Sequence, residues 1–273
     1  MIAQLPAQRS LVRNARRARQ ELNPITSFSS VSAIEFPEDI IRYNGSSILV
    51  YDSGNDGNQR ILVFSNEELL RVASRSLIFQ VDGTFRICPN LFHQFYTIHC
   101  WDSGVCVPVF YALLPGASTA IYENLVRCLS EKINPQIKVI MDMEIAVRNA
   151  FQIIFPQCEI IFCFYHFSQA HWGKIQSFGL TNDYLEDLEF SRKVKMYSAL
   201  AFMPLSMVDS AFDTLFDETS SDSRFDEFVQ YFETQYIGRI GRNGEQLPPR
   251  IAPEHWNQYQ IPKHSRQYFK DKQ

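Results

Sequence analysis

Two aspartates stand where an acidic side chain is unusual. Asp82 lies inside the apolar run 76–85 (SLIFQVDGTF), and Asp142 ends the short apolar run 136–142 (QIKVIMD). A charge in a buried strand loses its hydration, so it calls for a partner. If the two strands are neighbours, both carboxylates could hold divalent cations, and hard oxygen ligands select Mg²⁺ or Mn²⁺. Such cations assist hydrolysis or transfer at a phosphodiester.

Each aspartate also has a simpler interpretation. Asp82 could end its strand and bond to the turn at Gly83. Asp142 could be the N-cap of a following helix, and Glu144 in the first turn would then suit the helix dipole. The residue pattern alone leaves these interpretations open.

The elements that position the two aspartates follow from the hydropathy pattern. Three apolar and aromatic runs separated by turn residues predict an antiparallel meander: 76–85, 94–101 and 105–115. Helices and strands then alternate: helix 118–133, strand 136–142, helix 145–155, strand 159–165 and helix 168–179. This order predicts an α/β fold with a ribonuclease-H-like mixed sheet and helices on both faces.

The flanking regions complete the predicted organisation. Strands are expected at 46–54 and 60–65, and a helix follows with Ser65 as N-cap and Glu68 closing a capping box. The predicted segments are a basic N-terminal arm and linker (1–32), a hairpin and helix leading into the core (33–75), the ribonuclease-H-like core (76–180), an all-α helical insert (181–238) and an irregular tail (239–273).

Composition narrows the class of protein. The 273 residues are 45% hydrophobic and include 22 Phe, which excludes a disordered chain. No apolar run is long enough for a transmembrane helix, and the polar, Arg-rich start is not a secretory signal, so no membrane partner is expected. The six scattered cysteines are typical of reduced thiols in a cytoplasmic or nuclear protein.

The charge is unevenly distributed. The first 20 residues hold five Arg and no acid, whereas 181–235 has twelve acidic against four basic side chains. In a predicted helix over 7–21, four arginines fall near one face: Arg9, Arg13, Arg16 and Arg17. They could contact DNA phosphates, or they could belong to a solvated linker helix.

An ordered series of fragments resembles one known family. The fragments are VDGTF (81–85), FYTIH (95–99), VPVFYALLP (107–115), TAIYENL (119–125), DMEIAVRNAF (142–151) and FPQCEIIFCFYHFSQAHWGKIQSFGL (155–180). With their spacing, they resemble the transposase domain of Mutator-like elements (MULE), strongly over about 75–180 and more loosely over 33–75 and 181–260.

This resemblance implies a cut-and-paste DNA transposase with an Asp-Asp-Glu triad on a ribonuclease-H-like sheet. Asp82 and Asp142 would be the first two catalytic metal ligands, for Mg²⁺ or Mn²⁺. Transposon-end DNA would be the partner, and a homo-oligomer and a nuclear location are further expectations.

The chain also departs from the family pattern. The family's third acid follows the insert in a stretch resembling Arg-Thr-Asn-Asn and then Glu-Gly, and nothing like it follows HWNQY (255–259). Glu233, Glu245 and Glu254 all lie before that place, and no zinc module precedes residue 88. The expectation is therefore an incomplete or inactive transposase core. The alternative is a domesticated or fossil scaffold that binds DNA or protein without catalysis.

Cys163 and His166 match the family's Cys-x-x-His signature. The pattern predicts supporting packing and hydrogen bonding near Asp142. A closed zinc site would also recruit Cys158 and His171, but Cys163 and His166 have opposite parity along the strand, so structural zinc is not expected.

Overall fold

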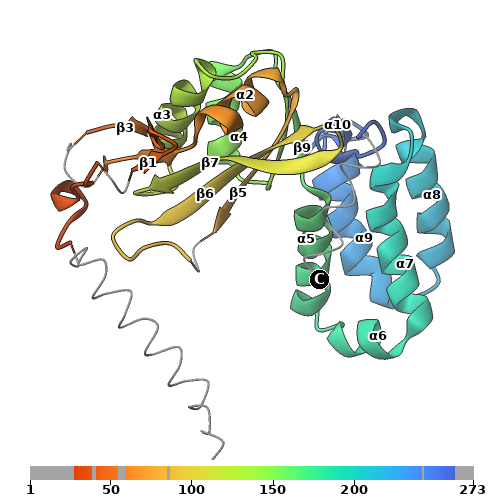
Figure 1. The fold of residues 1–273 in the computed structure, drawn as a ribbon. Coiled ribbons are helices and arrows are strands. Elements are labelled where there is room, and N and C mark those ends of the chain that lie inside the picture. The colour runs from red at the N-terminus through yellow and green to blue at the C-terminus, as the bar shows by residue number, and fades with distance from the viewer. Residues whose placement is uncertain (1–27, 39–40, 55–58, 85–86, 242, 262–273) are drawn as a thin grey trace, which may run out of the picture.

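A seven-stranded mixed sheet forms one half of the molecule (Figure 1). The structure is a computed structural model that describes residues 28–38, 41–54, 59–84, 87–241 and 243–261. The strand order is β3-β4-β7-β6-β5-β8-β9. The bounds are β3 Leu49–Asp52, β4 Leu62–Phe64, β5 Ile78–Thr84, β6 Gln94–Asp102, β7 Val105–Leu114, β8 Lys138–Met141 and β9 Glu159–Phe162. A separate small hairpin joins β1 (Arg42–Tyr43) and β2 (Ser46–Ser47).

The predicted order of elements in the core is confirmed. Strands β5, β6 and β7 form an antiparallel meander. Helix α3 (Thr119–Ser130) then leads to β8, and α4 (Ile145–Ile154) leads to β9. β8 pairs parallel with β5, and β9 pairs parallel with β8, because a helical crossover returns each strand in the same direction.

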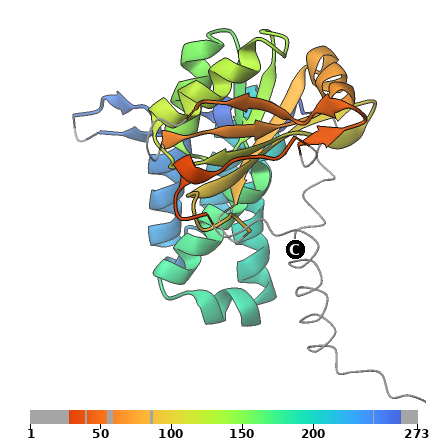
Figure 2. The same cartoon turned by 60° about the vertical axis from the view of Figure 1, so that its left-hand side comes forward.

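The helices of this half share one face of the sheet. Alternate residues of the strands, such as Phe79 and Val81 of β5, pack against α3, α4 and α2 (Glu67–Arg75) in one continuous core. We expected helices on both faces. In the described part of the chain, the opposite face instead meets the 3₁₀ turn Val31–Ala33 at the β4 end and Ile261 at the β8–β9 end. β3 and β4 lie at the front of Figure 2.

Helix α2 begins one residue later than its sequence pattern predicts. Asn66 is the N-cap, and its side chain accepts a hydrogen bond from the Leu69 N–H at 2.9 Å. The predicted cap, Ser65, is buried and donates its hydroxyl to the Val109 carbonyl at 2.7 Å. A tertiary hydrogen bond therefore takes the hydroxyl that the capping box would use.

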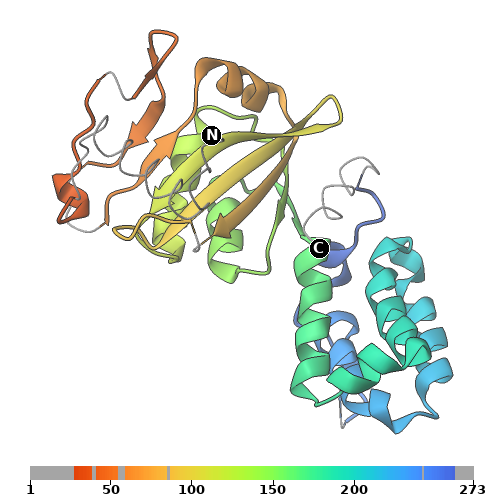
Figure 3. The same ribbon diagram turned by 60° about the horizontal axis from the view of Figure 1, so that its bottom comes forward.

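The second half is a group of helices beside the sheet (Figures 1 and 3). It holds α5 (Phe164–Ser177), α6 (Thr181–Glu186), α7 (Leu188–Ala199), α8 (Val208–Thr219) and α9 (Asp226–Phe232), followed by the π-helix Glu233–Ile237. Its core is aromatic: Phe167 stacks on Trp256 with ring centroids 5.1 Å apart. His171 is buried there, and burial lowers its pKa to about 3. A neutral imidazole thus belongs to this core.

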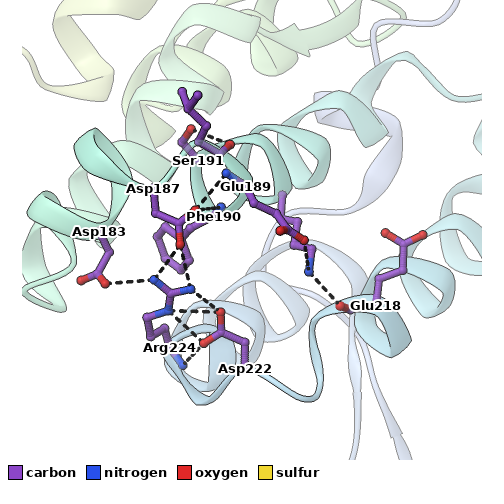
Figure 4. Close-up of polar contacts among 10 residues, drawn as sticks. Asp183, Asp187, Glu189, Phe190, Ser191, Glu218, Asp222 and Arg224 are labelled. Carbon is purple, nitrogen blue, oxygen red and sulfur yellow. Dashed lines mark hydrogen bonds and ion pairs between the residues drawn. The ribbon is translucent and has the colours of Figure 1, made fainter.

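Outside this core, one arginine gathers three carboxylates (Figure 4). Arg224 forms ion pairs with Asp183 at 3.0 Å, Asp187 at 3.1 Å and Asp222 at 2.7 Å. These contacts join α6 and the start of α7 to the turn before α9. The positive charge of Arg224 therefore neutralises part of the negative charge of the helical half.

The described part of the tail is more ordered than its composition predicts. It contains the hairpin of β10 (Arg239–Ile240) and β11 (Gln246–Leu247), and the short helix α10 (Pro253–Trp256). Beyond α10, Gln258 donates its side-chain amide to the Phe162 carbonyl at 2.8 Å and its backbone N–H to the Ala201 carbonyl at 2.6 Å. The tail therefore ties edge strand β9 to the helical half.

Candidate active site

The sheet brings Asp82 and Asp142 side by side. Strands β5 and β8 are parallel neighbours, with the register Ile78 to Lys138, Phe79 to Val139 and Gln80 to Ile140. Continued by two residues, this register places Asp82 of β5 beside Asp142, which directly follows β8. Both side chains are half-buried. Two residues that are 60 positions apart in sequence therefore meet at one end of the sheet.

Burial and the neighbouring negative charge of Asp82 both act on Asp142. Burial raises the pKa of the Asp142 carboxyl, and the charge of Asp82 adds to this rise. The charge of His166 and the hydrogen bond from the Glu144 N–H act in the opposite direction without cancelling it. A bound cation would relieve the repulsion between two half-buried like charges.

The structure also decides between the simpler interpretations. Asp82 lies within β5, opposite Thr97 of β6, and is not a residue of the turn. Glu144, and not Asp142, is the N-cap of α4, although its side chain makes no capping bond. Asp142 Oδ1 instead accepts the Glu144 N–H at 3.3 Å, which fixes the carboxylate close to the end of β8.

A buried hydrogen-bond network borders the pair. The Tyr122 hydroxyl of α3 donates to Glu144 Oε2 at 3.0 Å. The Gln94 side-chain amide of β6 donates to the Tyr122 oxygen at 2.7 Å and to the Gly116 carbonyl at 3.0 Å. Burial raises the pKa of Glu144, and the charge of Asp142 contributes. The sequence analysis did not predict this network. The feature that could have indicated it is the second acid, Glu144, two residues after Asp142.

Gly83 joins the network to the strand that carries Asp82. A Cβ atom on Gly83 would lie 2.6 Å from Gln94 Oε1 and 3.2 Å from the Tyr96 ring. Real Cβ atoms do not approach so closely, so only glycine fits here without displacing Gln94. The position of the Gln94 side chain over β5, next to Asp82, thus depends on glycine at position 83.

One known protein family matches the part of the chain that carries the two aspartates. Residues 78–170 match the MULE transposase domain. The match begins at the first residue of β5 and ends within α5, so it contains both aspartates. No curated protein matches the chain. The family match indicates a transposase-like function and hence interaction with DNA.

The signature residues Cys163 and His166 lie at the end of β9, within the matched transposase domain. Cys163 is the N-cap residue of α5, and its backbone N–H donates to the Met141 carbonyl at 2.6 Å. His166 lies in the first turn of α5, close enough to Asp142 for its charge to lower that carboxyl's pKa. The Cys163 backbone and His166 therefore lie close to Asp142, and the supporting role of the two side chains stays a prediction.

The other residues of the zinc hypothesis lie apart from these two. Cys158 packs against the sheet core, Cys163 packs with Ile140 and Ile261 on the opposite face, and His171 lies in the helical core. The six cysteines are free thiols.

The carboxylates of the matched segment would fit one hydrated divalent cation. Among the described residues, no group of three or more His, Cys, Asp or Glu is arranged to hold a metal ion. Glu233, Glu245 and Glu254 lie in the π-helix, the loop of the tail hairpin and α10. Mg²⁺ keeps several waters and is often bound by only one or two carboxylates, which is what Asp82 and Asp142 supply.

Two further predictions concern other parts of the chain. Arg9, Arg13, Arg16 and Arg17, the predicted DNA-contacting residues, lie outside the described residues. Among the residues that are described, no helix is both long and apolar enough to cross a lipid bilayer.

Proposed function

We propose that the matched domain binds one hydrated Mg²⁺ or Mn²⁺ between Asp82 and Asp142 and acts on phosphodiester bonds at transposon ends. The observation that carries this proposal is the parallel register of β5 and β8, which sets the two carboxylates side by side. When bound, the cation would stabilise charge on the reacting phosphate oxygens. The proposed substrate is DNA, which would place the protein in the nucleus.

The surrounding residues have supporting tasks in this proposal. Tyr122 holds the Glu144 carboxylate, and the Glu144 N–H holds Asp142 Oδ1. His166 lies beside Asp142 and offsets part of its negative charge. These contacts would limit the movement of the two ligands, which favours a defined coordination geometry.

Strand transfer by an Asp-Asp-Glu mechanism would require a further carboxylate at the pair. The described residues do not bring a third acidic group close enough to share a metal ion. We therefore propose that the chain binds the cation and that this binding alone does not give full transposition.

Metal binding is the direct test. In a calorimetric titration with Mn²⁺, we expect one site in the full chain and at least a tenfold loss of affinity in Asp82→Asn and in Asp142→Asn. The matched control is Asp102→Asn, because Asp102 lies on the same sheet but is ion-paired with Arg75 at 2.7 Å. Equal Mn²⁺ affinity in all four proteins would refute the proposal.

The lack of a third metal-binding acid among the described residues also favours a second candidate, a transposase-derived scaffold without catalysis. Nicking of supercoiled plasmid by the full chain with Mn²⁺, abolished in Asp82→Asn, would support the enzyme. DNA binding that survives Asp82→Asn, without nicking by either protein, would support the scaffold.

A further inference from the structure

A hairpin projects from the junction of the two halves (Figure 2). β10 and β11 pair antiparallel, with Arg239 opposite Leu247 and Ile240 opposite Gln246. At its base Gly238 has φ 107°, and a Cβ there would lie 2.8 Å from the Leu247 carbonyl oxygen. Glycine is therefore required where the chain enters the hairpin, and the hairpin has a defined backbone shape.

A residue next to the hairpin and a residue next to the acid pair both pack between the two cores. Ile251 follows the hairpin, donates its N–H to the Gln235 carbonyl at 2.9 Å and packs against both the sheet core and the helical core. Met143, the residue after Asp142, packs against the same two cores.

Two arginines lie at the base of the hairpin, Arg239 in β10 and Arg250 three residues after β11. Arg239 and Arg250 are exposed, and neither forms an ion pair within 4.0 Å among the described residues, although the charge of Arg239 acts on Glu233 and opposes the rise that burial causes in the pKa of that carboxyl. Five other described arginines are each paired with a carboxylate: Arg42, Arg60, Arg71, Arg75 and Arg224. Two guanidinium groups at the hairpin base are thus available for an external anion.

An apolar side chain lies between these charges and the tip. Ile240 is 78% exposed on a strand only two residues long. The hairpin also carries an exposed acid, Glu245, whose carboxylate accepts the Asn243 N–H at 3.0 Å. A narrow ribbon with two exposed guanidinium groups and one exposed aliphatic side chain has the chemistry to meet phosphates and a groove together.

We propose that the hairpin is a contact element for duplex DNA, in which Arg239 and Arg250 bind backbone phosphates and Ile240 enters the groove. The major groove of B-DNA admits a two-stranded β-ribbon. The inference rests on the proposed function in taking DNA as the substrate, but it requires no cation at Asp82 and Asp142.

The test is the salt dependence of DNA binding by the full chain. Fluorescence anisotropy with a labelled duplex of random sequence gives the slope of log affinity against log salt. Because each phosphate contact contributes a slope of about −0.9, Arg239→Ala/Arg250→Ala should weaken binding and reduce the slope by about 1.8.

The control removes the same charge elsewhere. Arg127 and Arg192 are exposed residues of α3 and α7 without ion pairs among the described residues, so Arg127→Ala/Arg192→Ala has the same net charge as the hairpin variant. This control should keep the slope of the unchanged chain. A hairpin variant that matches the control in slope and affinity overturns the proposal, as would be seen if the hairpin contacted a protein partner instead.

Ile240→Ser gives a second readout. It should weaken DNA binding severalfold with an unchanged salt slope, because an apolar contact releases no counterions. Mn²⁺ binding should be unaffected in all hairpin variants. If Asp82→Asn loses Mn²⁺ while the hairpin variants bind DNA like the control, the proposed function stands and the hairpin inference is wrong. If the unchanged chain does not bind Mn²⁺ but the hairpin variant has a reduced salt slope of DNA binding, the hairpin inference stands and the proposed cation site is wrong.

Discussion

The carboxylates around Arg224 in the helical half and Asp142 in the sheet half lie in opposite electrostatic surroundings. In the helical half, Arg224 pairs with Asp183, Asp187 and Asp222. In the sheet half, burial raises the pKa of Asp142, and no described lysine or arginine forms an ion pair with it. A carboxylate that is paired with an arginine stabilises the fold. A carboxylate that lies near a second carboxylate, and is not paired with an arginine, is suited to bind a ligand.

The buried polar groups differ in the same way. His171 is enclosed by aromatic rings, and its Nδ1 has a single partner, the Ser198 hydroxyl at 2.7 Å. In the sheet half, the buried amide of Gln94 and the hydroxyl of Tyr122 form a chain that leads to Glu144 at the acid pair. Aromatic packing stabilises the helical half. In the sheet half, buried polar side chains hold the Glu144 carboxylate in place.

The largest expected effect tests whether the helical half depends on its aromatic core. Phe167 is fully buried and stacks on Trp256. Phe167→Ala should lower the free energy of unfolding by about 3–5 kcal/mol, because it leaves a cavity in a packed core. Chemical denaturation measures this change. The control Phe216→Ala removes a ring that is 48% exposed and should cost much less. Similar losses in both would show that the aromatic core is not what stabilises this half.

A pair of glycine substitutions sharpens the comparison at intermediate size. Gly83→Ala should destabilise the protein by about 1–3 kcal/mol, because the new Cβ collides with Gln94. Gly173→Ala, in α5, meets no atom within 4 Å and should stabilise the protein by up to about 1 kcal/mol through helix propensity. Thermal unfolding of the two variants should therefore shift in opposite directions, and an unfolding midpoint of Gly83→Ala at or above that of the unchanged protein would contradict the close contact at Gly83.

The smallest expected effect comes from removing one carboxylate charge in each half. It tests the comparison between the two halves most directly. The folded-state pKa of Asp142 is raised, so its ionised form costs stability at neutral pH, and this cost disappears as the pH falls below the raised pKa. Hydrogen bonds from the Phe190 N–H and Arg224 lower the pKa of Asp187, so its contribution is present at neutral pH and is lost as the pH falls through that lowered value.

Without added divalent cations, Asp142→Asn should therefore raise the unfolding midpoint at about pH 7, and Asp187→Asn should lower it, each by a few degrees or less. Both differences should shrink at about pH 3, near the ordinary carboxyl range. Asparagine keeps the N-cap of α7, so the second change tests the charge rather than the cap. A midpoint that falls in Asp142→Asn would place that carboxylate in a stabilising interaction.

Much of the core could be predicted because its signals are local. Alternating and helical hydropathy periods gave the order from β5 to α5. The position of Asp82 and Asp142 in neighbouring strands then followed from topology. Ser65 and Asn66 are both good N-caps, however, and only the distant Val109 carbonyl decides between them.

The remaining features depend on contacts between distant segments. Gln94, Tyr122 and Glu144 come from a strand, a helix and a helix start, and nothing local marks them as partners. The tail has many Gly and Pro residues and no hydrophobic period, so α10 and the hairpin could not be predicted. The sharing of one sheet face by α2, α3 and α4 likewise has no signature within any single helix.

The bonds from the tail to β9 have a consequence for biosynthesis. β9 is an edge strand, and its Ile160 and Phe162 carbonyls accept hydrogen bonds from His255 and Gln258, almost a hundred residues later. On a growing chain this edge is made long before its cover emerges from the ribosome, and an uncovered strand edge can pair with other chains. Between the synthesis of β9 and that of Gln258, a nascent chain therefore has an uncovered strand edge that a chaperone could shield.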